Sequence, residues 1–147
     1  MKLSKVVLFG ILLVASPALS QTKSDVFMKD IPVTWLGLDF TSTKLIGDRE
    51  RLGSESDVRR LLDAWNDLIL AEQDKFDVAK AIGRAKVENV IDVTKEHNAE
   101  LDVMGMFSDN EGDYLHIKVS DVEEIIAGYD FKDLSGIGLM FNVESFN

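Results

Sequence analysis

Apolar residues gather into two stretches whose pattern predicts β-strands. In residues 33–40 (VTWLGLDF) apolar side chains fall on both sides of the pleat, which is typical of a strand that is covered on both faces and central in its sheet. Residues 41–46 are expected to extend this strand up to Gly47. Over residues 137–143 apolar positions alternate with the others, which predicts the final strand.

Between these stretches the spacing of apolar residues predicts one long amphipathic helix. Ser54 or Ser56 is expected to cap it, and it runs to about Glu72. Its apolar stripe is formed by Val58, Leu61, Leu62, Trp65, Leu68 and Ile69. Its outer face is expected to carry Arg59, Arg60, Asp63, Asn66 and Asp67. Because Trp35 and Trp65 lie on apolar stripes, both are expected in the core rather than in a sugar-stacking site.

Shorter elements are expected after this helix. Asp77 can cap a short helix over residues 78–81, and the β-branched stretch 87–94 (VENVIDVT) predicts a second strand. Residues 95–118 are ambiguous, and the favoured interpretation is a hairpin. Its two strands are residues 101–107 and 114–119, which flank a polar turn at 108–113.

The remaining signals complete a prediction of the fold class. Ser120 and Glu123 match a capping box, and Gly128 suits a left-handed end for the helix that they open. The order of elements predicts one layered α+β domain over residues 31–147. It would contain a small mixed sheet of four to five strands, with one long amphipathic helix and two short helices packed on it. Residues 21–30 are polar and predict a flexible leader.

The first twenty residues predict a cleavable secretory signal peptide. Lys2 and Lys5 precede ten uncharged apolar residues at 6–15, too few for the roughly 20 needed to span a bilayer. A buried core helix, the alternative, should have a polar face, which this run lacks. Small side chains then predict cleavage between Ser20 and Gln21, and hence a periplasmic or secreted protein.

Composition narrows the classes of function. The chain contains no cysteine, so no thiol is present for a lipid anchor, a disulfide or a thiolate metal site. Removing residues 1–20 leaves 127 of the 147 residues and changes the formal charge from −10 to −12, since Lys2 and Lys5 are lost and no acid is. Such a chain repels phosphate backbones, which argues against nucleic-acid binding. Thirteen acids and three lysines between Glu88 and Asp133 predict a solvated acidic surface, with a basic partner or loosely bound cations as the alternatives.

Asp39 is the residue that most suggests a functional site. It interrupts an apolar strand, so its carboxylate must be hydrogen-bonded, paired with a base or placed at the solvent-exposed end of the strand. An acid at a strand end is a common functional position in α/β folds and also a common place for an acid that ties a loop. His97 and His116 show no zinc-ligand spacing, so no metal site is predicted.

Other acidic residues offer weaker candidates. Asp109, Glu111 and Asp113 superficially resemble a calcium loop, but an EF-hand counted from Asp109 would need glycine and glutamate where Tyr114 and Ser120 stand. A solvated turn with weak cation binding is therefore the most that this segment predicts. Glu96, Glu100 and Asp102 could supply the acid–base pair of a glycoside hydrolase, but the sequence does not determine the distances between their carboxylates. No nucleophile, P-loop or dinucleotide motif occurs, and no cofactor is predicted.

Three segments together resemble a family of small exported proteins of unknown function from Gram-negative gut anaerobes. They are residues 33–41 (VTWLGLDFT), 61–70 (LLDAWNDLIL) and 129–147. The resemblance implies export to the periplasm but transfers no site residue. It also implies a longer chain, because members of the family continue past this end with strand-like sequence.

Three functions therefore stand open. The leading hypothesis is a non-catalytic periplasmic module that binds another envelope protein through its surface. The alternatives are a small carboxylate- or cation-dependent hydrolase and a truncated member of a longer family.

Overall fold

The computed structural model describes residues 24–47, 49–131 and 134–146 of the chain. The predicted signal peptide and the predicted cleavage site at Ser20 and Gln21 lie outside these residues. The predicted α+β class is confirmed, since helices accompany two small sheets. The prediction of one mixed sheet is wrong. Each sheet has three parallel strands, in the orders β3-β1-β5 and β4-β2-β6.

The central strand of the first sheet is β1 (Val33–Asp39), and all seven of its residues are buried as the sequence predicts. It pairs in parallel with β3 (Glu88–Asn89) on one side and with β5 (Ile137–Asn142) on the other. A β-bulge interrupts its pairing with β5 at Gly37, where φ is +103°. Only glycine adopts this conformation readily, so the sequence places a glycine at the bulge.

The strand does not continue over residues 41–46 as expected. A turn follows Asp39, and β2 (Lys44–Ile46) then pairs with β4 (Phe107–Ser108) and β6 (Ser145–Phe146). The two sheets are joined where β1 and β5 end. There the Val143 N–H donates to the Asp39 carbonyl (2.9 Å) and the Lys44 N–H to the Glu144 carbonyl (2.9 Å).

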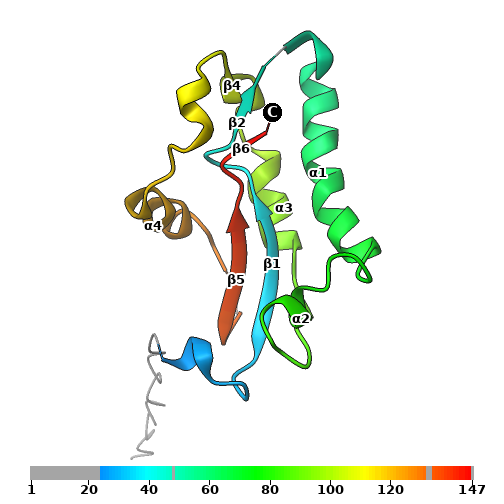
Figure 1. Cartoon of the computed structure of the whole chain (residues 1–147), viewed down its shortest axis with the longest axis vertical. Coiled ribbons are helices and arrows are strands. Elements are labelled where there is room, and N and C mark those ends of the chain that lie inside the picture. The colour runs from blue at the N-terminus through cyan, green and yellow to red at the C-terminus, as the bar shows by residue number, and fades with distance from the viewer. Residues whose placement is uncertain (1–23, 48, 132–133, 147) are drawn as a thin grey trace, which may run out of the picture.

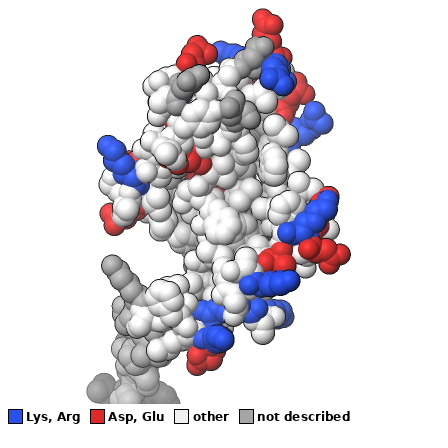
Figure 2. All heavy atoms as spheres, viewed as in Figure 1, with Lys and Arg blue, Asp and Glu red and all other residues white. Residues whose placement is uncertain are grey.

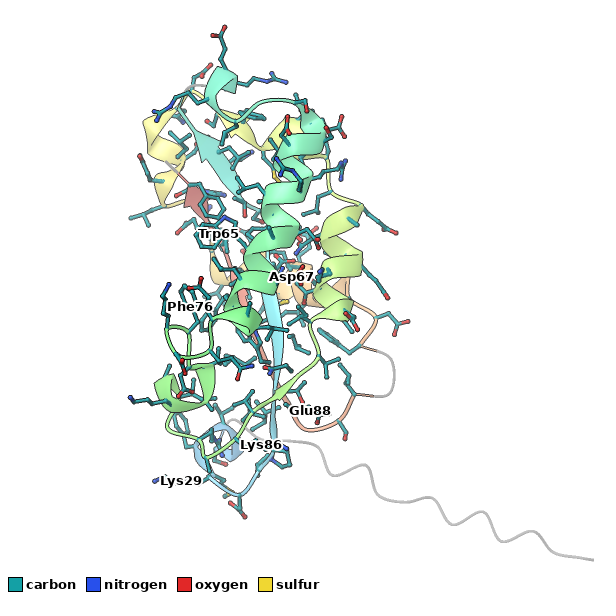
Figure 3. The ribbon with its side chains drawn as sticks, turned by 90° about the vertical axis from the view of Figure 1, so that its right-hand side faces the viewer. Lys29, Trp65, Asp67, Phe76, Lys86 and Glu88 are labelled. Atoms are coloured by element: carbon teal, nitrogen blue, oxygen red, sulfur yellow. The ribbon has the colours of Figure 1, made fainter. Side chains whose placement is uncertain are left out.

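The long amphipathic helix is confirmed as α1 (Glu55–Ala71). Ser54 caps it and shares a capping box with Asp57, whose pKa is lowered chiefly by the Ser54 side-chain hydrogen bond. Figure 1 shows α1 and α4 on opposite sides of β1 and β5, with α3 behind β1. In Figure 3 α1 faces the viewer with α3 beside it, and Lys95 of α3 binds Asp67 of α1 (2.7 Å).

The predicted outer face of α1 is wrong at one position. Asn66 is 1% exposed, whereas Leu61 on the predicted apolar stripe is 44% exposed. The reason is that Asn66 bonds the backbone of β1. Its Oδ1 accepts from the Leu38 N–H (2.7 Å), and its Nδ2 donates to the Leu38 carbonyl (3.1 Å). The buried amide therefore completes the edge of β1 beyond the two-residue strand β3.

Residues 87–99 also differ from the expectation. The short helix α2 (Val78–Ala81), capped by Asp77, is confirmed. The predicted strand over 87–94 is wrong beyond β3, because α3 (Asp92–Ala99) begins within it. From α3, Asn98 bonds β1 as Asn66 does, with its Nδ2 donating to the Leu38 carbonyl (2.8 Å). Burial of Val93 and Thr94 overrides their preference for strands.

The predicted hairpin over 101–119 is likewise wrong. It is replaced by the 3-10 helices η3 (Val103–Met106) and η4 (Glu111–Tyr114), with β4 between them in parallel to β2. The next helix, α4 (Val119–Ala127), begins before the predicted Ser120 cap, and the Lys118 N–H donates to Asp121 Oδ2 (2.8 Å) instead. Gly128 ends it, but with φ of −79° rather than a left-handed conformation.

The core lies between the first sheet and α1. Trp35 is fully buried, as predicted, whereas Trp65 is half-buried and packs against Phe146 with ring centroids 6.0 Å apart. Within the described residues, no helix is long and apolar enough to cross a membrane. Near the start of the described chain the Arg84 guanidinium donates to three backbone carbonyls, those of Val26 (2.7 Å), Met28 and Ile31 (3.2 Å).

Candidate functional site

An apolar groove of about 400 Å³ lies on the face of the first sheet opposite α1. Leu36 of β1 and Met140 of β5 are part of its floor, and Val122 and Ile126 of α4 form one wall. The segment from Leu134 to Gly136 lines the other wall. The groove exists because α4 is only nine residues long and covers this face incompletely. Its volume falls within the roughly 300–1,000 Å³ of most small-ligand sites.

The topology of the sheet places one end of the groove at a position that often binds ligands. From β1 the chain moves first to β3 on one side and later to β5 on the other. The strand order therefore reverses beside β1, and ligands of parallel sheets bind at such a reversal, at the carboxyl ends of the strands. Asp39 ends β1 and Asn142 ends β5.

Asp39 is fully buried at this point, and four donors surround its carboxylate. The Thr41 N–H (3.1 Å) and Asn142 Nδ2 (2.9 Å) donate to Oδ1. The Thr41 hydroxyl (2.8 Å) and the Tyr129 hydroxyl (2.5 Å) donate to Oδ2. A carboxylate offers about four lone-pair positions, so these donors occupy them all. To accept a proton from a substrate, Asp39 would first have to lose one of them.

The chemical effect of Asp39 is to hold its neighbours in fixed positions and protonation states. Burial, followed by the hydrogen bond to Asp39 and the charge of that carboxylate, raises the pKa of Tyr129 well above its usual value of 10.0, and only the Thr94 hydroxyl acts against them. The phenol therefore remains a protonated donor. Asn142 is held through its Nδ2 in the same way.

A histidine completes the cluster. Because the Thr41 hydroxyl gives its proton to Asp39, its oxygen is free to accept a hydrogen bond from Nε2 of His97 (3.1 Å). The His97 ring stacks on Tyr129 with centroids 4.2 Å apart, and Tyr129 stacks on Phe131 at 5.4 Å. Phe131 and Asn142 also line the groove, so the polar cluster and the groove form one continuous site.

Sequence reasoning identified Asp39 and missed Tyr129, Asn142 and Thr41 as its partners. Tyr129 lies 90 residues from Asp39 and Asn142 lies 103, and nothing in the local pattern of either segment marks it as a ligand of a buried acid.

The acidic turn is arranged as an ordinary 3-10 turn. The Asp113 carboxylate accepts from the Ser108 hydroxyl (2.6 Å) and from Asn110 Nδ2 (2.9 Å), while Asp109 is exposed. Glu111 belongs to the same turn, η4. Across residues 24–47, 49–131 and 134–146, no group of three or more acidic or histidine side chains is placed to hold a metal ion.

The other predicted candidates are not gathered at the groove. Asp102 caps η3 through the N–H groups of Met104 (3.2 Å) and Gly105 (3.3 Å). Glu96 and Glu100 are exposed at α3. His116 lines a separate hollow with Asp102, where each of its ring nitrogens lies 2.7 Å from a backbone carbonyl oxygen, one of Asp113 and one of Ser42.

Comparison with known proteins identifies no relative of the chain. No family model, curated protein or solved structure matches the chain, so the family resemblance drawn from the sequence stays a prediction.

Proposed function

We propose that the protein is a non-catalytic binding module of the periplasm, exported by a cleaved signal peptide, and that it binds another envelope component in the groove between β5 and α4. The observation that carries the proposal is the groove itself, an apolar hollow of about 400 Å³ that reaches Asn142 at the carboxyl end of β5. An apolar pocket with a few convergent polar groups is the usual form of a binding site.

The polar end of the groove supports binding rather than catalysis. The Asp39 carboxylate already has four donors, and the raised pKa of Tyr129 keeps its phenol protonated. Neither group is free to take a proton from a substrate. Instead, Asp39 holds Asn142 and Tyr129 in a fixed geometry, and Tyr129 stacks on His97 and on Phe131. A rigid polar end next to an apolar floor favours recognition of a ligand with little loss of entropy.

Binding by the groove can be tested with the neutral apolar dye Nile red. Ile126, which lines the groove, is changed to glutamate, and Val119 of the same helix, which is 78% exposed and outside the groove lining, receives the same substitution as the control. Ile126→Glu is expected to weaken dye binding at least tenfold, because a carboxylate is costly to desolvate against an apolar ligand. Val119→Glu should leave binding unchanged. Equal dye binding by both variants would exclude the groove as the site.

Export is tested separately. Mass spectrometry of the protein released by osmotic shock should give a chain that begins at Gln21. Recovery from the cytoplasm with Met1 in place would contradict the proposed location.

A further inference from the structure

In the described part of the chain β5 pairs only with β1, which leaves the backbone groups on its other side without a neighbouring strand. Two hydrogen bonds show which backbone groups point toward β1. The Ile137 N–H donates to the Pro32 carbonyl (3.3 Å), and the Val143 N–H donates to the Asp39 carbonyl (2.9 Å). Backbone N–H and C=O groups point to alternate sides along a strand. Those of the odd-numbered residues therefore point toward β1, and those of Gly138, Met140 and Asn142 point toward the open edge.

Apolar side chains flank this open edge on both faces of the sheet. On the groove face lie Ile126, which is 45% exposed, and Leu134, which is 38% exposed. On the other face Phe141 is 48% exposed and packs edge-on against Trp35, with ring centroids 4.9 Å apart. A strand laid along β5 would therefore meet apolar surface on each of its own faces. Such surface on a soluble protein commonly marks an interaction site.

The helix beside the edge, α4, is acidic. Figure 2 shows that the molecular surface over β5 and β1 in the view of Figure 1 is largely uncharged, with charged side chains at its periphery. Residues 119–130, which include the α4 wall of the groove, contain four acids and no base. Among them Glu123 and Glu124 are exposed. Their charge would attract a basic partner and repel an acidic one.

We propose that the occupant of this site is an extended segment of another polypeptide, with alternating apolar side chains and basic residues beside them, which adds to β5 as a further strand. The inference deepens the binding function proposed above and rests on it. A polypeptide fits because its backbone supplies the alternating donors and acceptors that Gly138, Met140 and Asn142 require, which a lipid or an apolar small molecule does not. A second copy of this chain fits less well, because it would bring the same acidic helix to the contact.

The test uses a fluorescein-labelled peptide of alternating valine and threonine with two lysines at each end, titrated with the purified protein and followed by anisotropy. The peptide is expected to bind, and replacing its lysines by glutamates should weaken binding at least tenfold. N-methylation of alternate amides along one edge should abolish binding, and methylation along the other edge should have little effect. Equal binding of both methylated peptides would overturn strand addition.

Two protein variants make the test specific. Met140→Pro removes an N–H that faces the open edge and not β1, so the fold should be kept, as an edge strand tolerates proline there, while peptide binding is lost. Double substitution of Glu123 and Glu124 by lysine leaves the strand untouched and should reverse the preference, with the glutamate-flanked peptide bound more tightly. If this variant still bound the lysine-flanked peptide more tightly, the proposal that the partner is basic would be refuted.

The outcomes also separate this inference from the binding function itself. Nile red binding that depends on Ile126, without any peptide binding, would refute strand addition and leave the groove as a binding site. Failure of both probes would refute both. A dimer in sedimentation experiments that the peptide dissociates would assign the edge to a second copy of the chain and overturn the proposed partner.

Discussion

Replacing Asn66 by alanine removes the side chain that completes the edge of β1. The Leu38 N–H, which donates to Asn66 Oδ1 at 2.7 Å, is then left buried without its acceptor. The Leu38 carbonyl loses one of two side-chain donors and keeps Asn98 Nδ2 at 2.8 Å. An orphaned buried donor costs about 1–3 kcal/mol and a lost neutral hydrogen bond about 1 kcal/mol, so the free energy of unfolding should fall by about 2–4 kcal/mol.

The assay is urea unfolding followed by circular dichroism, with the slope of the transition checked for equality between variants. Asp67→Ala is the matched control on the next residue of α1. It breaks the exposed ion pair with Lys95 (2.7 Å), which should change stability by about 0–1 kcal/mol. If Asn66→Ala destabilised the protein no more than Asp67→Ala, then Asn66 would not act as a substitute strand and the explanation for its burial would be refuted.

Three further predictions concern other parts of the fold. Gly37→Ala should lower the melting temperature more than Gly83→Ala, because both glycines have positive φ but only at Gly37 would the new Cβ meet another side chain (Asn66 Oδ1, 2.6 Å). Since the pKa of Tyr129 is raised in the folded state, the unfolded state loses its proton first above pH 10.0, so the contribution of Tyr129 to stability should be constant below that pH and fall above it. Tyrosinate absorbance compared with Tyr129→Phe measures this, and an unshifted titration would contradict it. Arg84→Ala should speed hydrogen exchange in residues 26–31 and leave β1 protected, whereas unchanged exchange would show that the guanidinium contacts do not order that segment.

The elements that the sequence predicted well are those that the pattern of apolar residues marks directly. The stripe of α1 repeats with the helical period because one face of the helix is buried, and β1 carries apolar residues on both sides of its pleat because both of its faces are covered. The Asn66 side chain escaped prediction for the same reason. A polar residue looks exposed in a periodic pattern, and its partner, the backbone of Leu38, lies 28 residues away.

Residues 87–119 were the least predictable part of the fold. Their β-branched residues favour strands locally, but the edge of β1 is completed by the Asn98 side chain of α3 rather than by a longer β3. In the candidate site, Asp39 was recognisable because an acid interrupts an apolar strand. Its donors Tyr129 and Asn142 were not, because only the parallel pairing of β1 with β5 brings them to it.

The parallel pairing of β1 with β5 has a consequence for the order of folding. Val33 pairs with Ile137, so the central strand waits for a partner synthesised about a hundred residues later, and such distant pairing slows folding. Until β5 arrives, the Asp39 carboxylate lacks its Asn142 donor, and β1 has open hydrogen-bonding groups along one side. For a polypeptide exported as proposed, this delay would keep the chain unfolded during translocation, and the same open side would be a target for chaperones that bind extended apolar segments.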